Sequence, residues 1–148
     1  MLRLVTATLV TATLAAACSG DDREPVIDLG ADAVGTCLDF EDFTETTVES
    51  LPIVACNERH THEIYATAVV TDEPVYPGFE ALEAEAQVRC LAEFEEYVGI
   101  SAFDSELFFS WLLPTLNTWE RDDDREIVCV IGEGNGAPLF SSIRNARR

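Results

Sequence analysis

The sequence contains no lysine: its basic side chains are 9 arginines, against 28 aspartates and glutamates. The formal net charge is −19 at pH 7. Nucleic acid is excluded as a partner, because phosphate backbones are bound by clustered cations. Anionic lipid headgroups would repel the chain for the same reason. The acidity by itself indicates solubility rather than a particular ligand.

Long apolar runs are also lacking, apart from one at the N-terminus. Residues 1–17, MLRLVTATLVTATLAAA, combine Arg3, an apolar and threonine-rich stretch and three alanines before Cys18. The stretch is shorter than the roughly 20 residues that span a bilayer, and the pattern predicts a signal peptide. Cysteine directly after the alanines resembles the lipobox of bacterial lipoproteins, which implies diacylglycerol on the Cys18 sulfur. The alternative is ordinary secretory cleavage that leaves Cys18 as a free thiol.

The chain is therefore expected to sit on the extracytoplasmic face of the cell membrane, anchored by the lipid on Cys18. Residues 18–34 are acidic and rich in small side chains, which predicts a tether. Residues 35–148 are sufficient for one compact domain.

No two cysteines have the Cys-x-x-Cys spacing, which argues against a zinc ribbon. Of the 5 cysteines, four remain once Cys18 is assigned to lipid: Cys37, Cys56, Cys90 and Cys129. An even number in an exported chain predicts disulfides, with three possible connectivities. Neighbour pairing, Cys37–Cys56 and Cys90–Cys129, is the simplest because each bridge closes a short loop.

The apolar periodicity predicts an α+β domain. A helix is expected over 79–98, where apolar residues recur at steps of three and four before Gly99. A helical turn is expected at 114–119, capped by Thr115. Strands are expected at 36–40, 51–56, 62–70, 106–114, 125–132 and 138–143. Short connections favour a small antiparallel sheet of about five strands, covered by one main helix and held by two disulfides.

Several short motifs occur one after another between residues 35 and 145. They are a Gly-x-Cys opening, a Cys-x3-His-x2-Glu element, a Tyr-Pro-Gly lead into a helix with a cysteine, a Pro-Thr…Trp turn and an Asp-Arg-x-Ile-x-Cys strand. The residues are Gly35, Cys37, Cys56, His60, Glu63, Tyr76, Pro77, Gly78, Cys90, Pro114, Thr115, Trp119, Asp124, Arg125, Ile127 and Cys129.

This arrangement resembles the septum-formation domain of actinobacterial exported proteins. It departs from the family at Arg59, where proline is usual, and after Trp119, where RDDD replaces an expected glycine. The resemblance implies a connection with cell division and assigns no catalysis or ligand.

The chain has only 2 histidines, both in CNERHTHE. Strand alternation would place Glu58, His60 and His62 on one side, a two-histidine, one-carboxylate face suited to a metal. Against this, only His60 falls on the family pattern. The preferred interpretation is that His60 hydrogen-bonds a loop beside Cys56 and pairs with Glu63, so no metal or cofactor is expected.

Aromatic residues gather between positions 103 and 119. In ELFFSWLL, alternation sends Phe109 and Trp111 to one face and Phe108 to the other, and both faces are apolar. Either the strand is central and buried, which is preferred, or one face around Trp111 or Trp119 is a binding patch.

No Gly-x-Ser-x-Gly motif marks a nucleophile. The preferred function is therefore a lipid-anchored extracytoplasmic binding or accessory domain with a partner in the envelope or division machinery. The alternative is an envelope hydrolase or metal-dependent enzyme that uses His60 and Glu63. The candidate binding residues are His60, Glu63, Trp111 and Trp119.

Overall fold

The computed structural model describes residues 31–40 and 51–148. The expected signal peptide, Cys18 and most of the tether lie outside the described residues. The described elements are η1 (Ala31–Ala33), β1 (Cys37–Leu38), β2 (Ile53–Val54), β3 (His62–Val69), α1 (Phe79–Val98), β4 (Leu107–Leu112), α2 (Leu116–Arg121) and β5 (Glu126–Glu133).

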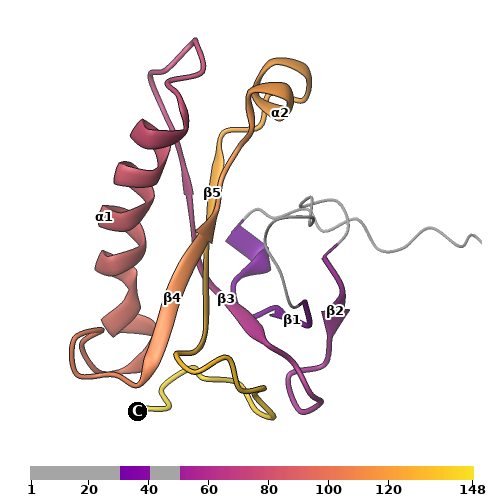
Figure 1. Cartoon of the computed structure of the whole chain (residues 1–148), viewed down its shortest axis with the longest axis vertical. Coiled ribbons are helices and arrows are strands. Elements are labelled where there is room, and N and C mark those ends of the chain that lie inside the picture. The colour runs from indigo at the N-terminus through magenta and orange to yellow at the C-terminus, as the bar shows by residue number, and fades with distance from the viewer. Residues whose placement is uncertain (1–30, 41–50) are drawn as a thin grey trace, which may run out of the picture.

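The strands form one five-stranded sheet in the order β2-β1-β3-β5-β4. Every neighbouring pair is antiparallel. The predicted α+β class is confirmed, with α1 lying along one face of the sheet (Figure 1). None of the described helices is long and apolar enough to cross a membrane.

β5 is buried along nearly its whole length because both faces of the sheet are covered there. Ile127, Cys129 and Ile131 belong to the core cluster shared with α1. Val128 and Val130 alternate with them and belong to a second cluster on the opposite face. The continuous apolar run of this strand is typical of a strand with two covered faces.

α1 places one apolar stripe on the sheet and leaves an acidic face in water. Its buried side chains are Leu82, Ala86, Cys90, Phe94, Tyr97 and Val98. The helix ends at Gly99, which takes a left-handed conformation (φ 89°) and donates its N–H to the Glu95 carbonyl. A glycine adopts this conformation without the steric cost that a Cβ would bring.

Both predicted disulfides are present. Cys37–Cys56 joins β1 to the loop between β2 and β3, and its Cα atoms are 5.3 Å apart. Cys90–Cys129 fastens α1 to β5 across a Cα separation of 5.5 Å.

The sheet differs from the sequence-based expectation at β4. That strand was expected to be central, and it lies instead at the edge of the sheet. The chain leaves β3, runs through α1 and returns as β4 on the far side of β5, so β5 takes the central position. Strand order depends on this crossover, which the apolar pattern of a single strand does not encode.

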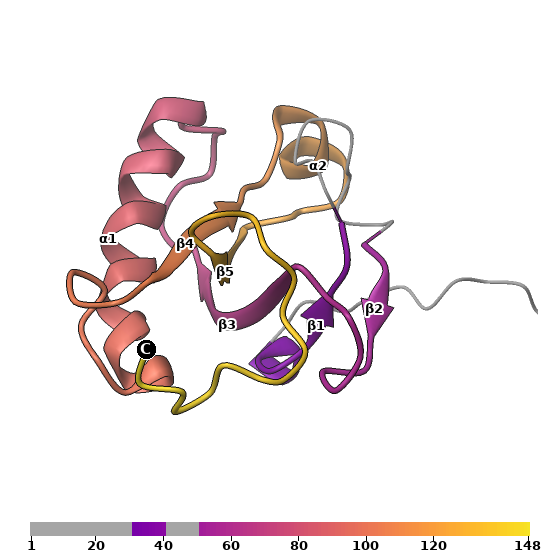
Figure 2. The same cartoon turned by 60° about the horizontal axis from the view of Figure 1, so that its bottom comes forward.

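The last segment of the chain, residues 138–148, was expected to begin with an edge strand at 138–143. Among the described residues a single isolated bridge forms there, between His60 and Leu139. The segment instead runs past β3 and β1 and returns to the end of α1 (Figure 2), where the Asn145 N–H donates to the Tyr97 carbonyl at 2.8 Å. We call it the C-terminal strap.

The fold also begins before residue 35. Ala33 follows the expected tether and is only 3% exposed, packed in the second core cluster. The end of the segment assigned to the tether is therefore part of the folded unit.

Candidate functional site

Glu63 is a fully buried carboxylate at the start of β3. Its Oε1 accepts hydrogen bonds from the Tyr97 hydroxyl and from the Ser142 hydroxyl (2.7 Å). Its Oε2 accepts the Ile143 N–H at 2.8 Å. Burial of a carboxylate is unfavourable unless donors replace the water it loses, and here α1 and the C-terminal strap supply them.

Tyr97 closes the site from the last turn of α1. Burial and the hydrogen bond to Glu63 raise the pKa of the Tyr97 hydroxyl well above its ordinary value of 10.0. The guanidinium of Arg144 lies 4.3 Å above the ring centre and opposes part of this rise. The hydroxyl therefore stays protonated at physiological pH and acts as a fixed donor to Glu63.

His60 lies beside Glu63 and is also fully buried. Its Nδ1 is 2.9 Å from the Glu58 carbonyl oxygen. Because a carbonyl only accepts, Nδ1 carries a proton, and Nε2 is the ring nitrogen left for another partner. Within the part of the chain that the structure describes, Nε2 is buried and has no hydrogen-bond partner.

The sulfur of Cys37 completes this cluster. Cys37, His60 and Glu63 each contribute one potential ligand atom, and these atoms lie within 4.8 Å of one another. All three residues are buried. β1 and β3 bring two of them together because Cys37 pairs with Glu63 across the ladder.

The two-histidine, one-carboxylate face, the less favoured interpretation of CNERHTHE, does not form among the described residues. β3 begins only at His62, so the residues before it follow a turn rather than strand alternation. Glu58 is exposed. His62 stacks on Phe40 with ring centres 4.3 Å apart, and burial lowers the pKa of its imidazole to about 4. The structure places Glu63 and Cys37 with His60, in place of Glu58 and His62.

The expected pairing of His60 with a loop is confirmed by its contact with the Glu58 carbonyl. No direct hydrogen bond joins His60 to Glu63 among the described residues, although their ligand atoms are neighbours.

The two candidate tryptophans lie mainly inside the protein. Trp119 is 2% exposed, with the Arg125 guanidinium 3.9 Å above its ring. Trp111 is half-buried and contacts Phe109, with ring centres 6.2 Å apart. A surface patch centred on Trp119 is therefore not formed.

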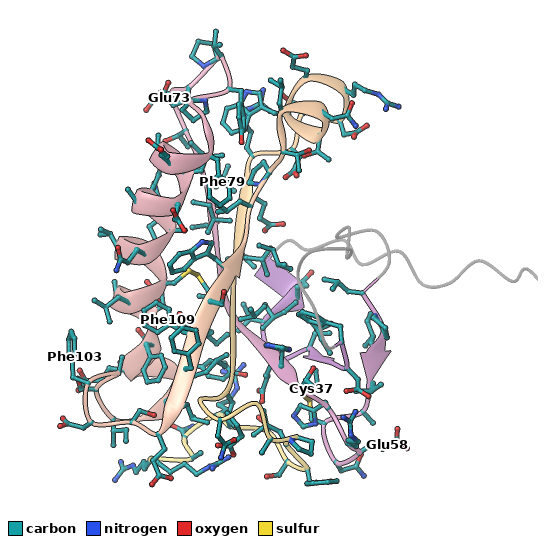
Figure 3. All side chains as sticks on the ribbon, viewed as in Figure 1. Cys37, Glu58, Glu73, Phe79, Phe103 and Phe109 are labelled. Carbon is teal, nitrogen blue, oxygen red and sulfur yellow. A yellow bond between two sulfur atoms is a disulfide. The ribbon has the colours of Figure 1, made fainter. Side chains whose placement is uncertain are left out.

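Two strongly exposed phenylalanines lie in β4 and in the segment that leads into it. Phe103 is 86% exposed and points away from the body of the molecule in Figure 3. Phe108, on the face of β4 opposite α1, is 66% exposed. Fully buried phenylalanine side chains gain about 1.5–3 kcal/mol each, so leaving these two in water forgoes a substantial stabilisation.

The outer edge of β4 also offers backbone groups. The Gly134 N–H donates to the Glu106 carbonyl, which continues the ladder between β4 and β5. In an antiparallel pair, inward and outward residues alternate, so Leu107, Phe109 and Trp111 direct their N–H and C=O groups outward. Among the described residues no strand pairs with this edge.

Three donors of the Glu63 site were missed by sequence reasoning: Tyr97, Ser142 and Ile143. Ser142 and Ile143 lie 79 and 80 residues from Glu63 along the chain. The Cys-x3-His-x2-Glu motif marked His60 and Glu63, but no local pattern marks partners at such separations.

A family model described as septum formation matches residues 20–129, which is more than half of the chain. The match confirms the resemblance carried by the cysteines, His60 and Trp119, and it indicates a role in septum formation or the cell envelope. No curated protein and no solved structure matches the chain.

Proposed function

Because the chain belongs to the septum-formation family, we propose that it is a lipid-anchored, extracytoplasmic module that docks a protein partner of the cell envelope. The proposal has two parts, an anchor and a docking surface. The sequence around Cys18 supports the anchor, and the exposed edge of β4 supports the docking surface.

The observation that carries the docking function is the edge of β4 with its exposed aromatic side chains. Phe108 is 66% exposed beside outward-facing backbone groups of Phe109 and Trp111. Extended peptides add to such edges through main-chain hydrogen bonds, while neighbouring side chains provide selectivity. An exposed, apolar edge would otherwise favour aggregation.

The charge of the chain determines the chemistry of the partner. With a formal net charge of −19, the molecule attracts cations and repels acidic surfaces. Glu106 is exposed next to β4, so an added strand would run beside a carboxylate. The occupant is therefore an extended segment with basic side chains from an envelope protein.

Burial of His60 and Glu63 favours this module over a hydrolase. Both residues are 0% exposed, and the C-terminal strap covers Glu63 through Ser142 and Ile143. A substrate would reach these side chains only if the strap left its place. The β4 edge needs no such movement.

The anchor is tested by mass spectrometry of the N-terminal peptide from membrane fractions. We expect a peptide that begins at Cys18 and carries the mass of a diacylglycerol with acyl chains such as palmitate. An unmodified thiol at Cys18 in those fractions would contradict the anchor.

The docking surface is tested with two matched variants, Phe108→Ser and Phe140→Ser. The two phenylalanines are 66% and 65% exposed, so the substitutions remove similar apolar surface from different places. We expect Phe108→Ser to lose an identified extracytoplasmic partner in affinity capture, while Phe140→Ser retains it. If both variants retain the partner equally, the proposal that the partner docks on β4 is wrong.

A further inference from the structure

A cluster of metal-ligand side chains is buried where β1, β3 and the loop before β3 meet. It contains Cys37, His60 and Glu63, with ligand atoms within 4.8 Å of one another. Cys37 is held in a disulfide with Cys56. We propose that reduction of this disulfide converts the cluster into a Zn²⁺ site with Cys37, Cys56, His60 and Glu63 as ligands.

The His60 ring is already oriented as metal-binding histidines are. Its Nδ1–H donates to the Glu58 carbonyl, which leaves Nε2 as the ring nitrogen for another partner. Histidine ligands of metals commonly donate their other ring N–H to a carbonyl or carboxylate, which fixes the tautomer. Nε2 is buried and has no hydrogen-bond partner among residues 31–40 and 51–148. A buried acceptor without a donor is unfavourable, and a bound cation would satisfy it.

Glu63 is held by three donors and retains capacity for a metal. An ionised carboxylate has about four lone-pair positions. Tyr97, Ser142 and the Ile143 N–H use three of them. These donors come from α1 and the C-terminal strap, so they would orient the carboxylate as outer partners of a metal ligand.

The spacing of the ligand atoms suits a small tetrahedral ion. Zinc bonds of about 2.0–2.3 Å place ligand atoms about 3.3–3.8 Å apart. Atoms that now lie within 4.8 Å of one another need shifts of about 1 Å to share the ion. Cys56 Sγ is bonded to Cys37 Sγ, so it lies next to the same position. Two thiolates with an imidazole and a carboxylate are a donor set that selects Zn²⁺.

Reduction of the Cys37–Cys56 disulfide needs a dithiol reductant. The Cys37–Cys56 bond accepts two electrons and two protons and becomes two thiols, while the reductant becomes a disulfide. Zn²⁺ then displaces both thiol protons to solvent as it binds. Cys56 is only partly buried, so it offers the reductant access that the other three ligands do not.

Thiol protection tests the site in the unaltered full-length chain. After reduction with a water-soluble phosphine, alkylation of each cysteine is followed by peptide mass spectrometry with and without Zn²⁺. We expect Zn²⁺ to slow alkylation of Cys37 and Cys56 at least about tenfold. Cys90 and Cys129, which lie outside the cluster, are the internal control. Equal rates with and without Zn²⁺ at Cys37 and Cys56 would overturn the site.

Variants separate a four-ligand site from two thiolates that bind zinc without the other two ligands. Co²⁺ replaces Zn²⁺ as a probe, because its thiolate charge-transfer and d–d bands report the ligand set. His60→Ala should weaken Co²⁺ binding by more than about a hundredfold, and Tyr97→Phe by about tenfold. His62→Ala removes the other histidine, which lies outside the cluster, and should leave the affinity unchanged.

Two results would overturn the proposal. One is undiminished Co²⁺ affinity in a His60→Ala chain whose circular dichroism shows it to be folded. The other is a wild-type chain that loses its folded spectrum with Zn²⁺ present when Cys37–Cys56 is reduced and Cys90–Cys129 is still oxidised. If His60→Ala itself does not fold, the Co²⁺ bands of the wild-type chain, which report the ligand set, decide the question. Capture of a partner through β4 involves none of these ligands, so the two proposals fail independently.

Discussion

At the scale of single residues, Glu63 connects parts of the chain that no strand pairing joins. It receives hydrogen bonds from the last turn of α1 through Tyr97, and from the C-terminal strap through Ser142 and Ile143. One buried carboxylate thus positions the strap against the sheet. His60 reinforces the same contact, because its bridge with Leu139 holds the beginning of the strap.

Replacement of Glu63 by alanine should destabilise the fold strongly. The variant leaves the Tyr97 and Ser142 hydroxyls and the Ile143 N–H without their acceptor, which we expect to cost about 3 kcal/mol or more. Urea unfolding with intact disulfides measures the change. Glu83→Ala, on the exposed face of α1, is the control and should stay within about 0.5 kcal/mol of wild type. A loss of less than about 1 kcal/mol for Glu63→Ala would contradict the role of the carboxylate.

His62 should make the fold sensitive to mild acid. Burial lowers the pKa of its imidazole from 6.5 to about 4, with Asp39 opposing and His60 reinforcing the change. Between these two pH values the unfolded chain binds a proton that the folded chain does not, so stability falls as pH decreases from about 6.5 to about 4. The contribution is fully present above pH 6.5.

The variant His62→Gln isolates this effect from the titration of carboxylates. We expect the melting temperature of the wild type to fall more than that of His62→Gln between pH 7 and pH 4.5. Parallel curves for the two proteins would contradict the buried, neutral imidazole. The variant should fold, because the position is only partly buried.

At the scale of elements, the two disulfides hold different parts of the fold. Cys90–Cys129 closes a sequence separation of 39 residues and fixes α1 on β5. Cys37–Cys56 closes a sequence separation of 19 residues and joins β1 to the loop between β2 and β3. The longer loop loses more entropy in the unfolded chain when it is closed.

Removal of the two bridges should therefore lower the free energy of unfolding by different amounts. The chain-entropy relation gives about 4 kcal/mol for the Cys90→Ala/Cys129→Ala pair and about 3 kcal/mol for Cys37→Ala/Cys56→Ala. Cys90 and Cys129 are both buried, whereas only Cys37 of the second pair is, so the packing loss is larger for the first pair. Urea unfolding of the two double variants checks the order. A larger loss for the Cys37/Cys56 pair would contradict it.

Elements with strong local patterns were predictable from the sequence. α1 occupies Phe79–Val98 as predicted, because its apolar steps and Gly99 define both the stripe and the end. β3 and β5 lie where strands were expected, at 62–70 and 125–132. The capping of α2 by Thr115 is confirmed, since its hydroxyl accepts the Thr118 N–H.

Strand order and the strap were not predictable in the same way. β4 has apolar residues on both faces, which is typical of a central strand, yet the crossover through α1 places it at the edge. The donors of Glu63 come from the strap, whose course depends on contacts far apart in the sequence. His60 and Glu63 were recognised as candidates, and their shared partner Cys37 was recognised only as a disulfide residue.

At the scale of the whole molecule, the proposed function would combine an acidic domain with a lipid anchor outside the membrane. The excess of acidic over basic side chains would repel anionic headgroups and hold the domain away from the bilayer. The β4 edge would then be available to a partner in the envelope.

Attraction between this acidic chain and a basic partner should weaken with salt. Exposed charges are screened over about 8 Å at physiological ionic strength and over about 3 Å at 1 M salt. We expect the association rate of the identified partner to fall as salt rises, while the fold remains intact. Biosensor kinetics at several salt concentrations measure this, and a salt-independent association rate would contradict a basic occupant.

The most direct test of the docking account is photo-cross-linking in living cells from the positions of Phe108 and Phe140. A photoreactive phenylalanine analogue at either position preserves the aromatic ring, and the two sites have nearly equal exposure, 66% and 65%. We expect a cross-link from position 108 to a basic, extended segment of an extracytoplasmic protein, and none from position 140. Identical cross-links from both positions, or cross-links only to cytoplasmic proteins, would contradict it.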